Sequence, residues 1–260
     1  MKLTFHKYQG TGNDFILIDN RKGIFSSDND AVAKLCDRHF GIGADGLLLI
    51  ETTEGYDFRM VYFNSDGSAA TMCGNGGRCI AAFANRLGIV GTNAHFLAAD
   101  GQHYAKIEVL DNLCTQVELS MNDVIPADMG EHFVVLNTGT PHFVRFVEEP
   151  DSIDLMTEGA KIRYAPDYAP VGINVDFARY AIDQIYVRTY EKGVEAETLS
   201  CGTGVTASAI AASLLTGRES YQVTTRGGKL AVAFERNGVT FTNIRLSGPA
   251  TFVYSGETEI

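Results

Sequence analysis

The chain repeats itself at long range, and this duplication constrains its fold more than any other feature. A cysteine followed by Gly-polar-Gly occurs twice, as Cys73 in "MCGNGGRC" and as Cys201 in "SCGTG", at an offset of 128 residues. Three further pairs of similar segments keep the same order at offsets of 127 to 129 residues, one of them aligning Gly12 with Gly139. Self-similarity at a fixed offset indicates a repeated structural unit. The sequence therefore predicts two similar halves, with a boundary near residues 118–124.

Within each half, the pattern predicts short strands on either side of one strong helix. Segments such as "FILID", "FRMVYF" and "HYAKIEVL" are rich in β-branched and aromatic residues and are bounded by Gly, Asn and Asp turns. We expect helices from Cys73 to Gly88 and from Cys201 to Gly217, since glycine commonly ends a helix. The second helix is apolar or small on every side, which is typical of a helix surrounded by protein. Each half is therefore interpreted as a curved sheet wrapped around a helix.

Composition limits the classes of partner. The 260 residues suffice for two domains, and 21 basic against 32 acidic residues give a net charge of −11, which repels nucleic acid and anionic membranes. The start "MKLTFHKYQGTGND" has no apolar signal region, and no later apolar run approaches the roughly 18 residues of a membrane helix. We therefore expect a soluble, cytoplasmic protein whose partners are small molecules or a second copy of itself, with no nucleic acid or membrane partner.

The five cysteines predict neither a disulfide framework nor a metal site, because their number is odd and no paired CxxC spacing occurs. Cys36, Cys79 and Cys114 are interpreted as core residues, since a lone buried cysteine behaves as a small hydrophobe. For Cys73 and Cys201, the duplicated glycine-rich context favours chemistry instead. A redox disulfide stays open as an alternative, as does a phosphate-binding loop, although no Lys-Ser/Thr follows the glycines.

A cysteine at a helix start can serve as a base beside an anion site. The first turn of a helix offers unpaired N–H donors and the positive end of a dipole, and adjacent glycines let a ligand approach the backbone. The same environment is expected to lower the pKa of the thiol. If the two halves face each other, one thiolate can remove an α-proton while the opposing thiol delivers one to the other face, and the amides hold the developing charge. Such a reaction inverts a stereocentre.

Taken together, the motifs closely resemble one family, the diaminopimelate epimerases, which are pyridoxal-independent enzymes of bacterial lysine and cell-wall precursor synthesis. The resemblance covers nearly the whole chain, through "GTGNDF", "FGIGADG", "YFNSDGS", "MCGNGGRC", "TPHFV", "GINVDF" and "ETLSCGTG". It implies an α/β (α+β) fold with two pseudo-symmetric domains, each a barrel-like, mainly antiparallel sheet around a central helix. It further implies an N-terminal half, 1–120, completed by 249–260, a C-terminal half, 121–248, and a cofactor-independent homodimer.

Motif by motif, the resemblance implies roles for particular residues. Cys73 and Cys201 look like the proton-transfer pair that epimerises LL- to meso-diaminopimelate, and His142 and Glu191 resemble groups that adjust the pKa values of the thiols. The residues that resemble substrate-binding groups are Asn13, Asn64, Gly74, Asn75, Thr140, Asn174, Glu191, Lys192, Gly202 and Thr203.

Three positions depart from the commoner family pattern, and all three concern substrate contacts. Gly46 stands where many members have Gln, Thr140 where they have Asn, and Lys192 where they have Arg. One extra residue also separates Lys192 from Cys201. Lys192 is therefore expected either to hold the distal carboxylate as a point charge or to be an exposed loop lysine.

Two other functions remain open at this stage. A proline or hydroxyproline racemase would use the same paired thiols, but its substrates would leave a polar cluster such as Asn64, Asn174 and Glu191 unpaired. A catalytically inactive amino-acid-binding protein would not need both cysteines. Exchange of an α-proton with solvent deuterium separates these cases.

Overall fold

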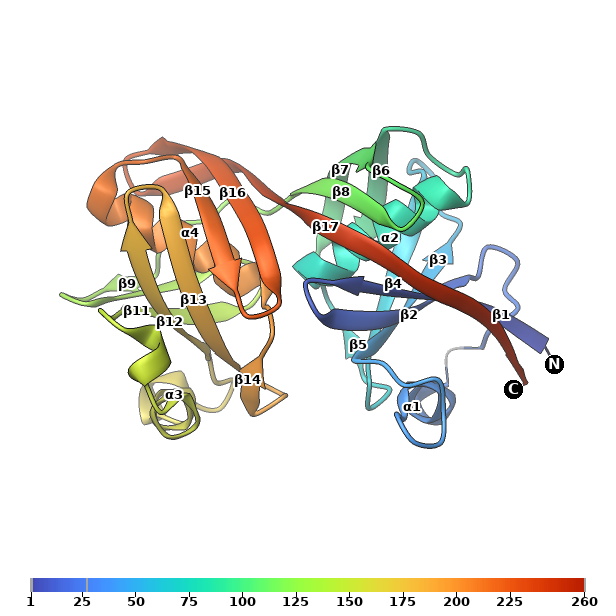
Figure 1. Ribbon diagram of the computed structural model, residues 1–260, viewed down its shortest axis with the longest axis horizontal. Helices are drawn as coiled ribbons and strands as arrows, with labels where there is room; N and C mark the ends of the chain where they lie inside the picture. Colours follow the sequence, from blue (N-terminus) through green and yellow to red (C-terminus); the bar gives the residue numbers. More distant parts are fainter. Residues whose placement is uncertain (1, 27, 260) are drawn as a thin grey trace. The chain divides into compact units, whose positions relative to one another are not determined.

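The computed structural model describes residues 2–26 and 28–259, and the chain divides into two compact units. Unit 1 comprises Met1–Leu119 with Gly248–Ile260, and unit 2 comprises Ser120–Ser247. Each unit is a curved sheet with one helix packed inside it and one helix outside (Figure 1). The predicted α/β fold with a sheet around a central helix is confirmed.

The sheet of unit 1 closes on itself. Its strands are β1 (Lys2–Gly10), β2 (Asn13–Asp19), β3 (Gly46–Glu51), β4 (Phe58–Asn64), β5 (Ala69–Ala70), β6 (Asn93–Ala98), β7 (Gly101–Val109), β8 (Cys114–Ser120) and the end of β17 (Thr240–Glu259). The pairing β2–β3 and the pairing β4–β6 are parallel, whereas β1–β2, β3–β4, β6–β7 and β7–β8 are antiparallel. β17 pairs antiparallel with both β8 and β1, which completes the ring.

Unit 2 repeats this order of pairings. Its elements are β9 (Asp128–Met129), β10 (Phe133–Asn137), β11 (Pro141–Phe146), η1 (Pro150–Ser152), η2 (Pro166–Tyr168), β12 (Asn174–Ala181), β13 (Gln184–Glu191), β14 (Ala196–Thr198), β15 (Ser220–Thr225), β16 (Gly228–Asn237) and the start of β17. The pairings β11–β12 and β13–β15 are parallel, and β10–β11, β12–β13, β15–β16 and β16–β17 are antiparallel. The agreement with unit 1 is the structural form of the sequence duplication.

The two enclosed helices are the ones that follow the paired cysteines. Helix α2 (Gly74–Arg86) packs against β1, β2, β3, β4 and β7, and helix α4 (Gly202–Thr216) packs against β10 to β13, β15 and β16. α4 ends at Gly217, whose φ of 75° is a left-handed conformation that glycine adopts without steric cost. α2 ends two residues before Gly88, so both predicted helices are confirmed. Because each sheet surrounds its helix, each cysteine is held at a fixed helix start.

The outer helices were not predicted from the sequence. Helix α1 (Asn29–Cys36) in unit 1 packs its Val32 and Leu35 with Ile16 and Leu47 of the sheet in one apolar cluster. β2 is therefore buried on both faces, which explains the uninterrupted apolar run "FILI" in its sequence. In unit 2, helix α3 (Leu155–Arg163) covers β12 and β13 in the same way. Both helices are short, at eight residues for α1 and nine for α3.

Across residues 2–26 and 28–259, no helix has the length and apolar character needed to cross a membrane.

Candidate active site

Both cysteines of the repeated motif occupy the residue that directly precedes an enclosed helix. Cys73 has extended backbone angles (φ −138°, ψ 124°) at the start of α2, and Cys201 has similar ones (φ −115°, ψ 110°) at the start of α4. The carbonyl of each accepts the first helical hydrogen bond, from Gly77 and Val205 respectively. The N–H groups of the residues that directly follow each cysteine have no earlier carbonyl within the helix to bond. Each unit thus presents one thiol beside one anion-binding helix start.

In unit 1, the thiol of Cys73 faces an acceptor on Asn13. The Sγ of Cys73 lies 3.6 Å from Oδ1 of Asn13, and Asn75 Nδ2 donates to the same oxygen at 3.3 Å. Asn13 Nδ2 donates to Asp45 Oδ2 at 2.7 Å, and this contact settles which end of the Asn13 amide faces the cysteine. The structure therefore brings together three of the residues to which the resemblance gave roles, Asn13, Cys73 and Asn75.

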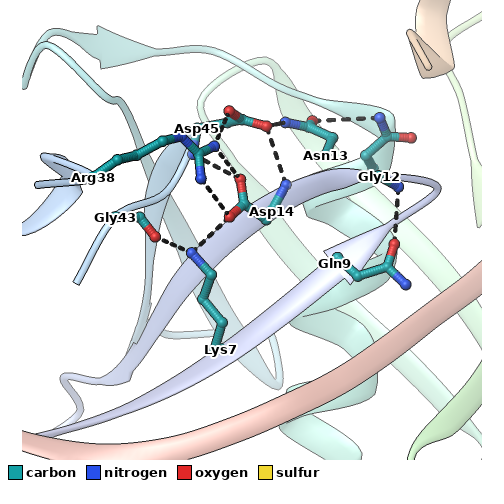
Figure 2. A network of polar contacts seen from close by, with 9 residues as sticks. Lys7, Gln9, Gly12, Asn13, Asp14, Arg38, Gly43 and Asp45 are labelled. Atoms are coloured by element: carbon teal, nitrogen blue, oxygen red, sulfur yellow. Dashed lines mark hydrogen bonds and ion pairs between the residues drawn. The ribbon is translucent and has the colours of Figure 1, made fainter. Parts of the chain in front are cut away.

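Asn13 is anchored by a network of charged side chains (Figure 2). Arg38 Nη2 lies 2.7 Å from carboxylate oxygens of both Asp14 and Asp45, and Lys7 Nζ lies 2.7 Å from Asp14. Lys7 also donates to the carbonyl of Gly43. The network joins β1, β2 and the loop before β3, so it holds the loop that carries Asp45 against the strand that carries Asn13.

We expect the network to make the stability of the protein depend on acid pH through Asp14. Burial opposes ionisation of this carboxyl group, but hydrogen bonds and charges from Arg38 and Lys7 outweigh it and lower the pKa from 3.8 to about 2. Because the folded pKa lies below the unfolded one, the stabilisation is complete above about pH 4 and is lost as the pH falls toward 2. The difference in unfolding free energy between wild type and Asp14→Asn, measured in urea, should shrink over that range. A difference that stays constant with pH would contradict this expectation.

The first turn of α2 is also held by a buried arginine. Arg78 is 0% exposed and donates to the carbonyl of Gly74 at 3.2 Å and to Asn75 Oδ1 at 2.9 Å. Its guanidinium also reaches Thr11 Oγ1 and the carbonyl of Pro249. Arg78 therefore fixes the two residues that follow Cys73, Gly74 and Asn75. The sequence analysis did not single it out, although an arginine inside the apolar stretch "RCIAAF" is a signal that could have done so.

In unit 2, Cys201 begins a chain of hydrogen bonds. Its Sγ lies 3.3 Å from Oγ1 of Thr203, which in turn lies 2.9 Å from Nε2 of His142. His142 Nδ1 lies 2.6 Å from Oδ2 of Asp176. Thr203, His142 and Asp176 are all buried, with His142 and Asp176 at 0% exposure. The structure thus joins three residues to which the resemblance gave roles, and it adds Asp176.

The expected lowering of the thiol pKa at a helix start is wrong for Cys201. Burial raises the pKa of Cys201 well above its usual value, and the nearby carboxylates of Glu191 and Asp176 raise it further. The contact with Thr203 and a hydrogen bond from the Gly204 amide lower the pKa but are outweighed. The neutral thiol of Cys201 is therefore favoured, since desolvation disfavours the thiolate more than the helix start favours it.

The position after Thr203 has room for glycine alone. A Cβ at Gly204 would lie 2.5 Å from Oδ1 of Asp176 and 3.2 Å from Cε1 of His142. The corresponding glycine of α2, Gly76, has its nearest neighbours at 3.5 Å. The close approach of Gly204 is what lets the buried His142–Asp176 pair lie against the first turn of α4.

We expect Gly204→Ala to destabilise the protein by about 1–3 kcal/mol, because the new methyl group forces the buried pair to move. Gly76→Ala is the matched control, since it makes the same change at the same position of the other enclosed helix. It should leave stability unchanged or raise it by up to about 1 kcal/mol. Urea unfolding of both variants tests this. Equal effects at the two glycines would show that the contact with Asp176 is unimportant.

The remaining candidate residues of unit 2 lie around the same chain of contacts. Asn174 is buried, its Oδ1 accepts the backbone N–H of Lys192 at 2.7 Å, and its Nδ2 lies 3.3 Å from Nε2 of His142. Thr140 is half-buried, and its carbonyl accepts the N–H of Thr138 in the turn before β11. Glu191 acts on Cys201 through its charge. Gly202 is the buried first residue of α4.

Asn64 lies opposite Gly46 in the antiparallel pair of β3 and β4. It is exposed at the end of β4, where its Nδ2 donates to Ser68 Oγ at 3.0 Å and its carbonyl accepts the N–H of Gly67. These contacts with Ser68 and Gly67 are those of a turn residue. Gly46, where the family pattern often has Gln, is the buried first residue of β3.

Two solved structures have a fold similar to that of this chain. One is a phenazine biosynthesis protein of the PhzF family from Bacillus anthracis, with a TM-score of 0.77, 14% identity and coverage of 100% of both chains. The other is a hydroxyproline epimerase from Agrobacterium vitis, with a TM-score of 0.75, 15% identity and coverage of 99% of this chain and 92% of the other. At such low identity the likeness shows the fold alone. The chain thus has a fold that is also found in a phenazine biosynthesis protein and in a hydroxyproline epimerase.

Sequence comparison identifies the family. The family model described as diaminopimelate epimerase matches residues 5–121 and 134–253. The chain is 50% identical over 258 residues to the diaminopimelate epimerase of Flavobacterium psychrophilum, covering 98% of both chains. It is 41% identical to that of Chlorobaculum tepidum, covering 95% of this chain and 98% of the other. The chain belongs to the diaminopimelate epimerase family, and it is an enzyme of the racemase and epimerase class of isomerases.

Proposed function

We propose that this protein converts LL-diaminopimelate to meso-diaminopimelate by a two-cysteine acid–base mechanism, without a cofactor, in the synthesis of lysine and peptidoglycan precursors. The observation that carries the proposal is the placement of Cys73 and Cys201 at equivalent helix starts of two units with the same pairing order. The family membership supplies the substrate class.

Inversion at a carbon needs a base on one face and an acid on the other. In the proposed reaction one thiolate removes the α-proton, and the thiol of the other unit delivers a proton to the opposite face. The N–H groups at the helix starts, from Gly74, Asn75, Gly202 and Thr203, stabilise the negative charge that develops on the α-carboxylate. After one turnover the two cysteines have exchanged protonation states.

The two thiols differ in their surroundings, and the difference suggests their starting roles. Cys201 is buried with a raised pKa, so it starts as the acid. Cys73 is half-buried at the start of α2, and we propose that it is the base, which requires its S–H to leave the acceptor Oδ1 of Asn13. One charged and one neutral thiol is also the pair that avoids repulsion between two thiolates.

Other side chains are proposed to recognise the rest of the substrate. Asn13, Asn64 and Asn174 offer amide groups. Glu191 offers a negative charge for the distal amino group of the substrate, and Lys192 offers a positive charge for its distal carboxylate. Thr140 lies in the turn before β11, where the family more often has Asn. We further propose that the enzyme works in the cytoplasm as a homodimer.

The experiment that tests this function is exchange of the α-proton in deuterium oxide without added cofactor. Mass spectrometry should show deuterium entering the α-position of LL- and meso-diaminopimelate, with conversion of one into the other. Proline and trans-4-hydroxyproline are the control substrates, and we expect no exchange from them. Exchange from proline alone would assign the protein to the racemases instead, and exchange from none would identify a binding protein.

A further inference from the structure

The hydrogen bonds that begin at Cys201 continue into the interior of unit 2, beyond the contacts that a cysteine needs in order to donate a proton. They pass through Thr203 and His142 and end on Asp176, a carboxylate with 0% exposure. A buried carboxylate is costly unless its oxygens are hydrogen-bonded, so its presence needs a cause. The contacts of Asp176 and His142 show what this carboxylate does.

The neighbours of His142 determine which of its ring nitrogens carries the proton. The backbone N–H of Lys192 donates to Oδ1 of Asn174 at 2.7 Å, so the NH₂ group of Asn174 is the end that faces His142. That NH₂ group lies 3.3 Å from Nε2, and because it can only donate, Nε2 is the acceptor. The proton of the neutral ring therefore lies on Nδ1 and is donated to Asp176 at 2.6 Å.

With this ring form, all the hydrogen bonds from Cys201 to Asp176 are donated in the same direction. Since Nε2 is an acceptor, the hydroxyl of Thr203 donates to it at 2.9 Å and is the nearer of the two donors that share its single lone pair. The oxygen of Thr203 is then left with lone pairs toward Cys201, and it accepts the S–H at 3.3 Å. Every proton from Cys201 to Asp176 points inward, away from the thiol.

Asp176 is itself held in place on both of its oxygens. While Oδ2 accepts from His142, Oδ1 accepts from the hydroxyl of Thr189 at 2.6 Å. Asp176 and Thr189 are directly opposite each other in the antiparallel pair of β12 and β13, so the strand register fixes this contact. The missing side chain at Gly204 leaves the space that the carboxylate fills.

We propose that Asp176 is a positioning residue for Cys201, which acts by holding His142 in the Nδ1-protonated form with the Nε2 lone pair aimed at the hydroxyl of Thr203. Starting from its neutral form, Cys201 becomes the base of the reverse reaction when its proton bonds to the Thr203 oxygen as the hydroxyl proton moves to Nε2. The S–H and O–H bonds break while a new O–H and an N–H bond form. The products are a thiolate, an intact threonine and an imidazolium paired with the Asp176 carboxylate.

The proposal rests on the proposed function only in giving Cys201 a proton to transfer, and its first test needs no turnover. Long-range ¹H–¹⁵N NMR of the full chain distinguishes a protonated from an unprotonated ring nitrogen, and a His142→Gln variant assigns the signals. At neutral pH we expect a protonated Nδ1 and an unprotonated Nε2 in the wild type. A protonated Nε2 with an unprotonated Nδ1 would overturn the proposal without any variant of Asp176.

The second test uses Asp176→Asn, which keeps the shape and removes the charge. We expect the preference for the Nδ1-protonated ring to be lost and kcat to fall about a hundredfold, while KM changes less than about threefold. Thr203→Val should lower kcat similarly but leave the ring form of His142 unchanged. Asp183→Asn, the same change in the exposed turn between β12 and β13, is the control and should alter neither quantity.

The outcomes separate this proposal from the proposed function. An Asp176→Asn enzyme with the wild-type ring form and wild-type kcat would overturn the positioning role even if diaminopimelate is the substrate. If instead the wild type exchanges no diaminopimelate, the proposed function fails, whereas the ring form of His142 and its response to Asp176→Asn still decide the positioning role.

Discussion

Replacing either Cys73 or Cys201 by alanine is expected to lower the rate of epimerisation by at least about a thousandfold, or about 4 kcal/mol of transition-state stabilisation. The reason is that inversion needs both an acid and a base, so one thiol cannot compensate for the other. Replacing either cysteine by serine should also lower the rate severely, although a hydroxyl can still supply a proton. The measurement is kcat/KM for conversion of LL- to meso-diaminopimelate.

Cys79→Ala is the matched control for the two cysteine variants. Cys79 lies on the same helix as Cys73, but it is fully buried in the core of unit 1, and burial raises its pKa to about 12. We expect Cys79→Ala to lower stability through lost packing and to leave the specific activity of the folded enzyme within about threefold. If the alanine variants of Cys73 and Cys201 both keep substantial activity, the two-base mechanism is wrong.

Lys192→Met is expected to lower kcat/KM about a hundredfold, or about 2.7 kcal/mol, if this lysine holds the distal carboxylate of the substrate. Lys192→Arg should be tolerated or improve kcat/KM, because the planar guanidinium donates two parallel hydrogen bonds. The backbone N–H of Lys192 donates to Asn174 in either variant, so the comparison reports on the side chain.

The surroundings of Lys192 sharpen this test. An exposed Lys192 could pair with Glu191 or with Glu195. Of these, Glu195 instead lies 3.0 Å from Arg163 and accepts the N–H of Gly193. A change in kcat/KM within about twofold for Lys192→Met would place this side chain in solvent and assign the carboxylate to another group.

The sequence predicted those parts of the molecule that depend on local patterns. Both enclosed helices follow from an apolar stretch between a Cys-Gly start and a glycine stop, and α4 begins and ends as this pattern requires. Helices α1 and α3 escaped prediction because each buries one face against a strand far away in sequence. Val32 of α1, for example, shares a cluster with Leu47 of β3.

The candidate site was predicted unevenly for a related reason. A motif identifies residues by type and spacing, so the cysteines and their glycine neighbours were found. Asp176, Arg78 and Asp45 contact His142, Pro249 and Asn13, which lie 34, 171 and 32 positions away in the chain respectively, and local spacing carries no such information. The expected direction of the pKa shift of Cys201 was wrong. A helix start can be predicted from the sequence, whereas the burial that outweighs its effect cannot.

The strand β17 determines the order in which the protein can be finished as it is made. Its first residues pair with β16 in unit 2, and its last residues pair with β8 and β1 in unit 1. During synthesis, the N-terminal unit therefore waits with two unpaired strand edges until the whole of unit 2 has left the ribosome. Such edges are templates for pairing with other chains. The half of the enzyme that is translated first is thus the last to be protected from aggregation.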